Sequence, residues 1–413
     1  MSYMCARVLA RLSAALFVVV GITGCVFEPG VLSPIDELEP DGGPRPDSSP
    51  PVDSRLTPDS MAMVDGSLPP IDASTSNQRR KQITIQSSRV EAPPGPRVLT
   101  DFPVLFSVTD EDIAARATTD GSDIYFVAAD GVTRLDFEIE KWVPGTGELV
   151  AWVKLPQLSA TSNTVFYVHY GDPDQAGSLN PRDVWTNDFV AVWHLAQNPG
   201  PGGAGDIVDS TTGNDGTARN MQANDLVTGR VGNALDFDGS NDEITFDNPI
   251  SGAGPHTISA WVNQRTTTSN DALVVLGNDA PSQARWFYSA YFDNKVAFGF
   301  YANDRDPDLV IVNQGWKLLH WTFDGASNRL YVDGALEYGP IAPPNGGINT
   351  QGSDGRIGNT PPGTPGFGSN MNLDGQADEV RIATTARSAE WIQTEFNNQS
   401  SPSTFYAVGE ETP

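Results

Sequence analysis

Closely spaced carboxylates are the first residues in this sequence that could do chemistry. Enzymes that hydrolyse glycosidic bonds place two carboxyl groups on either side of the bond. The nearest arrangements here are Glu138 and Glu140 in FEIEKW, and Glu243 and Asp247 in DEITFD. Glu138 and Glu140 alternate with apolar residues, which predicts a strand with both acids on its water-facing side. Glu243 and Asp247 share a strand face, but Thr245 stands between them. Neither pair is predicted to be catalytic.

Histidine and nucleophile patterns give no catalytic site either. The four histidines are His169, His194, His256 and His320, and no HExxH motif occurs. Three of them (His169, His194 and His320) lie beside aromatic residues in strand-like sequence, where we expect hydrogen-bonded structural histidines rather than bases or metal ligands. The GxSxG motif of serine hydrolases is missing from the sequence. We therefore predict no catalytic residues, and a chain that is not an enzyme.

Acidic turns are better candidates, because they could bind a cation. Asp236, Asp238 and Asp242 crowd one turn, and Asp374 and Asp378 lie in a second acidic segment. Carboxylate and loop carbonyl oxygens are the ligands that calcium prefers. The alternative is that these aspartates cap their own turns by accepting hydrogen bonds from backbone amides. Both interpretations stay open from the sequence.

Aromatic residues are dense between positions 286 and 301. Trp286, Tyr288, Tyr291 and Tyr301 could present ring faces on which sugars stack, with polar groups beside them for the hydroxyls. The alternative is that at least half of them pack in the core against an opposite sheet. We predict these four residues as the candidate ligand-binding surface.

Short strand-like runs must position these residues. After residue 80 they are bounded by Gly, Pro, Asp or Asn and lack helical periodicity, which predicts an antiparallel β-sandwich over residues 81–186. The runs are 83–85, 102–108, 122–127, 135–142, 149–155 and 164–170.

A second set of strands predicts another β domain over residues 187–413. In WFYSAYFDNKVAFGFY, the turn at 293–295 separates two aromatic strands, so these must be antiparallel neighbours. Residues 388–396 have helical spacing after a serine suited to capping. We expect the final strand, 404–408, to return to a jelly-roll sheet.

The N-terminus has the layout of a secretory signal: Arg7 and Arg11, an apolar stretch, then small residues before Cys25. The apolar stretch is too short to favour an uncleaved transmembrane helix. Residues 22–25 resemble the bacterial lipobox, which predicts a signal peptide over 1–24 and a lipid anchor on Cys25. The alternative is an ordinary secretory signal with a chance cysteine. Residues 25–80, rich in Pro, Asp and Ser, predict a disordered tether.

Composition narrows the class of partners. The chain has a net charge of −27 and no basic cluster beyond residues 79–81, which argues against nucleic acid. It has two cysteines; Cys5 lies in the predicted signal, so only Cys25 would remain after cleavage and we expect no disulfide.

The second domain resembles the laminin G-like, concanavalin A-like jelly roll of bacterial surface proteins. The resemblance rests on ordered motifs spread over residues 192–391, namely VWHL, DSTTGNDGTARN, GRVGNALDFDGSNDEITF, HTISAWVNQ, GWKLLHWTFDGASNRLYVDG and DGQADEVRIATTARSAEW. It implies an all-β fold and a structural calcium ion shared by Asp238 and Asp378. Glycoside hydrolases of this fold carry three alternating carboxylates, which the DEITFD segment lacks.

The first domain resembles the bacterial domain of unknown function 2341, through DFPVLFSV, DGSDIYFVAADG, LDFEIEKW and AWVKLPQLSATSNTVFYVHYGDP. Together the two resemblances imply a lipid-anchored envelope protein that displays a lectin-like module for glycan or protein ligands. Val26 after Cys25 favours the outer membrane or cell surface. The alternatives are a divergent glycoside hydrolase or lyase of the concanavalin A-like fold, and a structural subunit of an envelope assembly.

Overall fold

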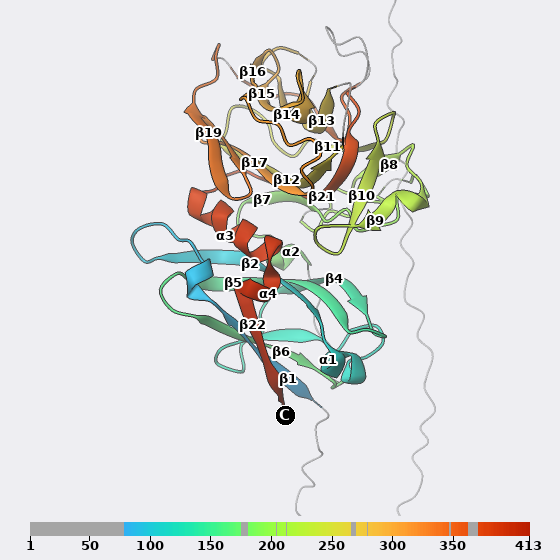
Figure 1. Cartoon of the computed structure of the whole chain (residues 1–413), viewed down its shortest axis with the longest axis vertical. Helices are drawn as coiled ribbons and strands as arrows, with labels where there is room; N and C mark the ends of the chain where they lie inside the picture. Colours follow the sequence, from blue (N-terminus) through green and yellow to red (C-terminus); the bar gives the residue numbers. More distant parts are fainter. Residues whose placement is uncertain are drawn as a thin grey trace, which may run out of the picture. The chain divides into compact units, whose positions relative to one another are not determined.

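The computed structural model of the chain contains two antiparallel β-sandwiches (Figure 1). The structure describes residues 78–174, 181–203, 205–211, 213–265, 270–278, 280–346, 348–361 and 371–413, which all fall in the unit Pro69–Pro413. The predicted signal peptide, Cys25 and the tether up to residue 77 lie outside these residues. The expected all-β, antiparallel architecture is confirmed.

The first sandwich consists, among the described residues, of a four-stranded sheet in the order β22-β1-β6-β3 and a three-stranded sheet in the order β2-β5-β4. Its strands are β1 (Arg79–Ile85), β2 (Val98–Thr109), β3 (Tyr125–Ala128), β4 (Phe137–Val143), β5 (Glu148–Ser159), β6 (Thr164–Tyr170) and β22 (Tyr406–Thr412). Its short helices are η1 (Ser87–Arg89), α1 (Glu111–Arg116) and α2 (Pro181–Val184). Alternate residues of both sheets, such as Val104, Phe106, Phe126 and Phe166, form one buried core.

The second sandwich consists, in the described part of the chain, of an eight-stranded and a seven-stranded sheet. The eight-stranded sheet contains β7 (Phe189–Trp193), β9 (Leu226–Thr228), β10 (Asn233–Asp238), β12 (His256–Gln264), β17 (Lys317–Phe323), β18 (Asn328–Val332), β19 (Ala335–Ile341) and β21 (Asp374–Ala383). The seven-stranded sheet contains β8 (Thr217–Arg219), β11 (Glu243–Asp247), β13 (Asp271–Gly277), β14 (Ala284–Tyr291), β15 (Lys295–Phe300), β16 (Asn303–Arg305) and β20 (Asp354–Ile357). The 3-10 helix η2 (Ala223–Asp225) precedes β9. The core between the sheets includes Trp193, Phe287, Phe298 and Trp321.

The expected aromatic hairpin is confirmed, since β14 pairs antiparallel with β15. Its turn residues Asp293 and Asn294 have φ of 61° and 62°. A tight hairpin turn needs this left-handed backbone at both central positions, and Asp and Asn tolerate it better than most residues.

Strand β21 changes neighbours halfway along its length. Its first half pairs with β10 and its second half with β7, while β12 borders it on the other edge. The register against β12 shifts between Ser259 and Trp261, opposite Glu379, which has a φ of 53°. Such a bulge re-aims side chains, so both Glu379 and Arg381 point away from the core between the sheets, and contact each other.

The chain ends in the first sandwich, not in the second. The predicted helix is confirmed as α3 (Ala389–Ser400), and the Ser388 side chain accepts the Trp391 N–H at its start. After α4 (Pro402–Phe405), strand β22 pairs with β1, so the red end of the chain lies beside the blue β1 in Figure 1. The expectation that the last strand returns to a jelly-roll sheet was wrong, because Phe405 and Tyr406 are buried in the first core.

No helix among the described residues is long and apolar enough to span a membrane.

Candidate functional site

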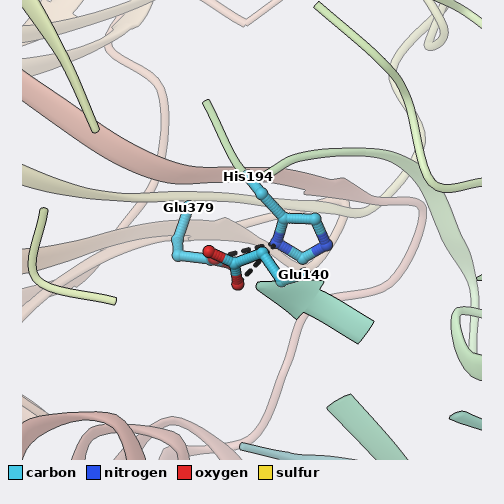
Figure 2. A group of neighbouring side chains, drawn as sticks. All are labelled: Glu140, His194 and Glu379. Carbon is cyan, nitrogen blue, oxygen red and sulfur yellow. Dashed lines mark hydrogen bonds and ion pairs between the residues drawn. The ribbon is translucent and has the colours of Figure 1, made fainter. Parts of the chain in front are cut away.

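A buried cluster of charged side chains joins the two sandwiches. Figure 2 shows its centre, where Glu140 of β4, His194 just after β7, and Glu379 of β21 point toward one another. Nδ1 of His194 lies 2.8 Å from Oε1 of Glu379 and 3.7 Å from Oε2 of Glu140. Their side chains are 2% (Glu140), 3% (His194) and 1% (Glu379) exposed. One ligand atom from each lies within 4.8 Å of the others.

The expectation that Glu138 and Glu140 face water was wrong. The alternation along β4 correctly places them on the face opposite the first core, but the second sandwich covers that face. An apolar cluster that includes Trp152, Trp185 and Val192 fills the space beside them. A strand pattern indicates which face is polar, whereas what covers that face depends on contacts distant in sequence.

Each charged group in the cluster is held by a second polar group. Oε2 of Glu138 accepts hydrogen bonds from Trp185 Nε1 at 2.8 Å and lies 3.3 Å from Nε2 of His194. Ser210 donates to the other oxygen of Glu138 at 2.6 Å. Trp152 Nε1 donates to Glu140 at 3.0 Å. These bonds fix the side chains in one arrangement.

Arg381 extends the cluster to helix α3. Its guanidinium donates to Glu379 at 2.5 Å and to Glu395 of α3 at 2.9 Å. It also lies 4.3 Å from the ring centre of Trp152, a cation–π contact. Nε2 of His320 lies 3.2 Å from Glu395. Two charged networks therefore meet at one arginine.

The pKa values of several groups in this cluster differ from those of the free side chains. Burial and the charge of Glu379 raise the pKa of Glu140 to about 8. Burial and the charges of Glu379 and Glu140 raise the pKa of Asp378 well above its usual range. Burial alone would lower the pKa of His194, but the charges on Glu379 and Glu138 raise it well above its usual value. The centre thus has an excess of acidic groups.

An open groove lies elsewhere, at the β8–β11–β20 edge of the seven-stranded sheet. Its volume is about 430 Å³ and its lining is mostly polar, with Asn214, Asp215, Thr217, Asp247, Ser353 and Asp354 among the lining residues. The Asn214 amide holds one wall, since it donates to the Asp247 carbonyl at 2.6 Å and accepts the Asp247 N–H at 3.1 Å. Carboxylates, hydroxyls and an amide therefore face one open space.

The predicted calcium ligands are not brought together. Asp238 lies opposite Asp374 in the β10–β21 pair, and Asp378 is four residues further along, roughly 13 Å at the rise of a strand. Asp238 is exposed and accepts the Ser240 N–H at 2.7 Å, as the turn-capping alternative expects. Asp378 is buried and accepts the N–H groups of Arg230 and Val231. This pair does not fit one shared ion; calcium binding by the chain stays a prediction.

The predicted aromatic residues do come together, in a cluster separate from the core between the sheets. Trp286 stacks on Tyr301 at 4.5 Å and Tyr288 on Tyr291 at 4.8 Å. Core packing against the opposite sheet therefore does not account for them. Trp286 and Tyr288 are each 1% exposed, so in this structure their rings offer no open face to a ligand.

The sequence analysis missed Glu379, Arg381 and Ser210 as members of the charged cluster. The first two lie in ADEVRIA, where charged residues interrupt a run of apolar ones. Charges inside a fully buried strand need partners, and that signal could have marked this strand. The expected hydrogen bonds of His194 and His320 are present, whereas both ring nitrogens of His169 lack a partner among the described residues.

Comparisons with known families match this architecture. Residues 238–393 match the Concanavalin A-like lectin/glucanases superfamily, and residues 120–191 match a Domain of unknown function (DUF2341). The two matches lie along the chain in the predicted order. No curated protein matches the sequence.

Parts of the chain are similar to parts of several solved structures, at low sequence identity. The binding domain of Paraclostridial Mosquitocidal Protein 1 is 15% identical, with a TM-score of 0.38 over 51% of this chain and 52% of that one. Domain 4 of AbnA, a GH43 extracellular arabinanase from Geobacillus stearothermophilus, is 17% identical, with a TM-score of 0.37 over 51% of this chain and 98% of that one. A Trypanosoma rangeli sialidase in complex with sialic acid is 13% identical, with a TM-score of 0.40 over 64% of this chain and 44% of that one. The chain therefore spans about half of the first of these proteins.

Proposed function

We propose that this chain is a lipid-anchored binding protein of the bacterial envelope, whose second domain binds glycans without catalysis. The observation that carries the proposal is the open polar groove at the edge of the seven-stranded sheet. Its volume of about 430 Å³ lies in the usual range of small-ligand sites. Its carboxylates, hydroxyls and amide suit the hydroxyl groups of a sugar, and the concanavalin A-like match supports the same ligand class.

The exposure of the groove carboxylates supports binding over hydrolysis. A glycosidase needs one carboxylic acid that stays protonated, which burial in an apolar pocket normally provides. Asp215 and Asp247 are exposed and Asp354 is half-exposed. Glu140, whose pKa is raised to about 8, is buried at the junction and does not line the groove. Anchoring through Cys25 would place this groove outside the cytoplasm.

A glycan array probed with the intact chain, with and without calcium, tests the proposal. For any glycan that binds, Asp247→Ala should weaken affinity about tenfold or more, because a hydrogen bond to a charged group contributes about 1.5–3 kcal/mol. Asp308→Ala, whose carboxylate is 95% exposed on another edge of the domain, is the matched control and should bind as the parent chain does.

Two results would count against this function. An array that stays blank in both conditions contradicts glycan binding, and release of reducing sugar from a bound polysaccharide contradicts the absence of catalysis. If Tyr301→Ala abolishes binding while Asp247→Ala does not, the aromatic cluster and not the groove is the binding surface.

A further inference from the structure

We propose that Glu140, His194 and Glu379 form a binding site for one divalent transition-metal ion, of the Zn²⁺ or Mn²⁺ class, that ties the two sandwiches together. The three residues come from β4, from the end of β7 and from the bulge in β21. Their ligand atoms already lie within 4.8 Å of one another (Figure 2). A metal bound here would link strand β4 of the first sandwich to β7 and β21 of the second.

Two buried carboxylate oxygens, one in the cluster and one next to it in sequence, lack a hydrogen-bond partner in the described part of the structure. They are Oε1 of Glu140 and Oδ1 of Asp378. A buried polar atom without a partner is costly, so each such atom in a folded protein calls for an explanation. A cation at the cluster would give Oε1 of Glu140 a partner, and its charge would offset that of the neighbouring buried acids Asp378 and Glu379.

The backbone approaches Glu140 and Asp378 closely at two glycines. Residues 229–232, Gly-Arg-Val-Gly, lie against both acids. A side chain at Gly232 would collide with Oε1 of Glu140, and one at Gly229 would collide with Oδ2 of Asp378. The amides of Arg230 and Val231 hold Oδ2 of Asp378 at 2.7 and 2.8 Å, which leaves Oδ1 for another partner.

The groups behind the three ligands are those expected of a metal site. A histidine that binds a metal through one nitrogen commonly donates its other N–H to a carboxylate, which fixes the ring. Here Nδ1 of His194 faces Glu379 and Glu140, while Nε2 lies 3.3 Å from Glu138. Glu379 and Glu140 are held by Arg381 and Trp152.

The donor set decides the class of ion. Calcium and magnesium prefer oxygen ligands alone, whereas an imidazole nitrogen with two carboxylates suits zinc, manganese and related ions. A divalent cation would also compensate the excess of buried acids around His194. Because ligands must be deprotonated to bind, uptake of the ion should release protons.

Isothermal titration of the chelator-treated intact chain with ZnCl₂, MnCl₂ and CaCl₂ tests the proposal. We expect one Zn²⁺ or Mn²⁺ ion per chain, and binding heats in buffers of different ionisation enthalpy should show proton release. Glu140→Gln and His194→Gln should each weaken binding at least tenfold, since even residues behind metal ligands commonly contribute that much. Glu148→Gln removes a half-exposed carboxylate of the neighbouring strand β5 and should leave binding unchanged.

The variant Glu140→Gln keeps the shape of the side chain and an oxygen for Trp152, so it decides the question even if His194→Gln does not fold. Circular dichroism establishes that each variant is folded. The proposal is overturned if the parent chain binds neither Zn²⁺ nor Mn²⁺, if it binds only Ca²⁺, or if folded Glu140→Gln binds the ion as tightly as Glu148→Gln.

Discussion

Individual charged side chains are buried at the junction of the two sandwiches. Arg381 is 2% exposed and contacts Glu379 and Glu395, whose side chains are 1% and 8% exposed. A buried ion pair is not by itself strong evidence of stability, because desolvation opposes the attraction between the charges. Removal of one partner is different, because the remaining charge is left buried and uncompensated.

We therefore expect Arg381→Met to lower the free energy of unfolding by about 3–5 kcal/mol, measured by urea denaturation in chelator. The comparison is Arg329→Met, which breaks a pair with Asp324 whose side chains are 27% and 36% exposed. A solvent-exposed pair contributes at most about 1 kcal/mol. Equal losses in both variants would mean that burial of the junction pair has no energetic consequence.

At the scale of elements, the features set by local sequence could be predicted, whereas the pairing between distant segments could not. The 286–301 hairpin and the capped helix after Ser388 follow from turn residues, alternation and a capping serine, all of which are local signals. The partner of β22 depends on which sheet edge is open, and no local pattern encodes that. The same holds for the candidate site. The alternation of residues predicted that Glu138 and Glu140 share a polar face, but it could not predict that the second sandwich covers this face.

Helix α3 shows why pattern alone misplaced the end of the chain. It packs Trp391 against Phe102 of the first sandwich, with ring centres 4.6 Å apart. On its other side Gln399 accepts the Trp261 N–H of the second sandwich at 2.6 Å. Because both sides are covered, polar residues such as Glu395 and Asn398 are buried as well, and the helix lacks a simple amphipathic pattern.

Glu395 should make the stability of this helix junction sensitive to acid. Burial would raise its pKa, but the charges of His320 and Arg381 hold the pKa at about 2. Because the folded value is below the unfolded one, this carboxylate stabilises the fold above pH ~4.5 and loses that effect as the pH falls toward 2. The full contribution is on the order of 3 kcal/mol.

Glu395→Gln should therefore cost stability at pH 7, and the difference from the parent chain should shrink between pH 5 and pH 3. Urea denaturation at several pH values measures it. Glu390→Gln, in the first turn of the same helix, should run parallel to the parent chain. A difference for Glu395→Gln that stays constant with pH would contradict the assigned role.

At the scale of the whole molecule, the two sandwiches are interleaved in the chain. The first core contains Trp391, Phe405 and Tyr406, which come after every strand of the second sandwich in sequence. Thr394 and Asn398 of α3 also hydrogen-bond the backbone of Glu91 and Leu105. The first sandwich is therefore completed only when the end of the chain has been made.

Removal of residues 401–413 should unfold the first sandwich while the second keeps its fold. Burial of Phe405 and Tyr406 contributes about 1.5–3 kcal/mol each, and the deletion also removes the β1–β22 pairing and both bonds between Tyr406 Oη and Ser107. The sum approaches the roughly 5–15 kcal/mol that stabilises a typical domain.

Hydrogen exchange followed by mass spectrometry should then show lost protection in β1 and β6 but retained protection in β13 and β14. Tyr406→Phe keeps the ring and should lose protection only slightly. The opposite result, in which β13 and β14 lose protection while β1 and β6 keep it, would contradict the interleaved fold. It would instead agree with the expectation that β22 belongs to the jelly roll.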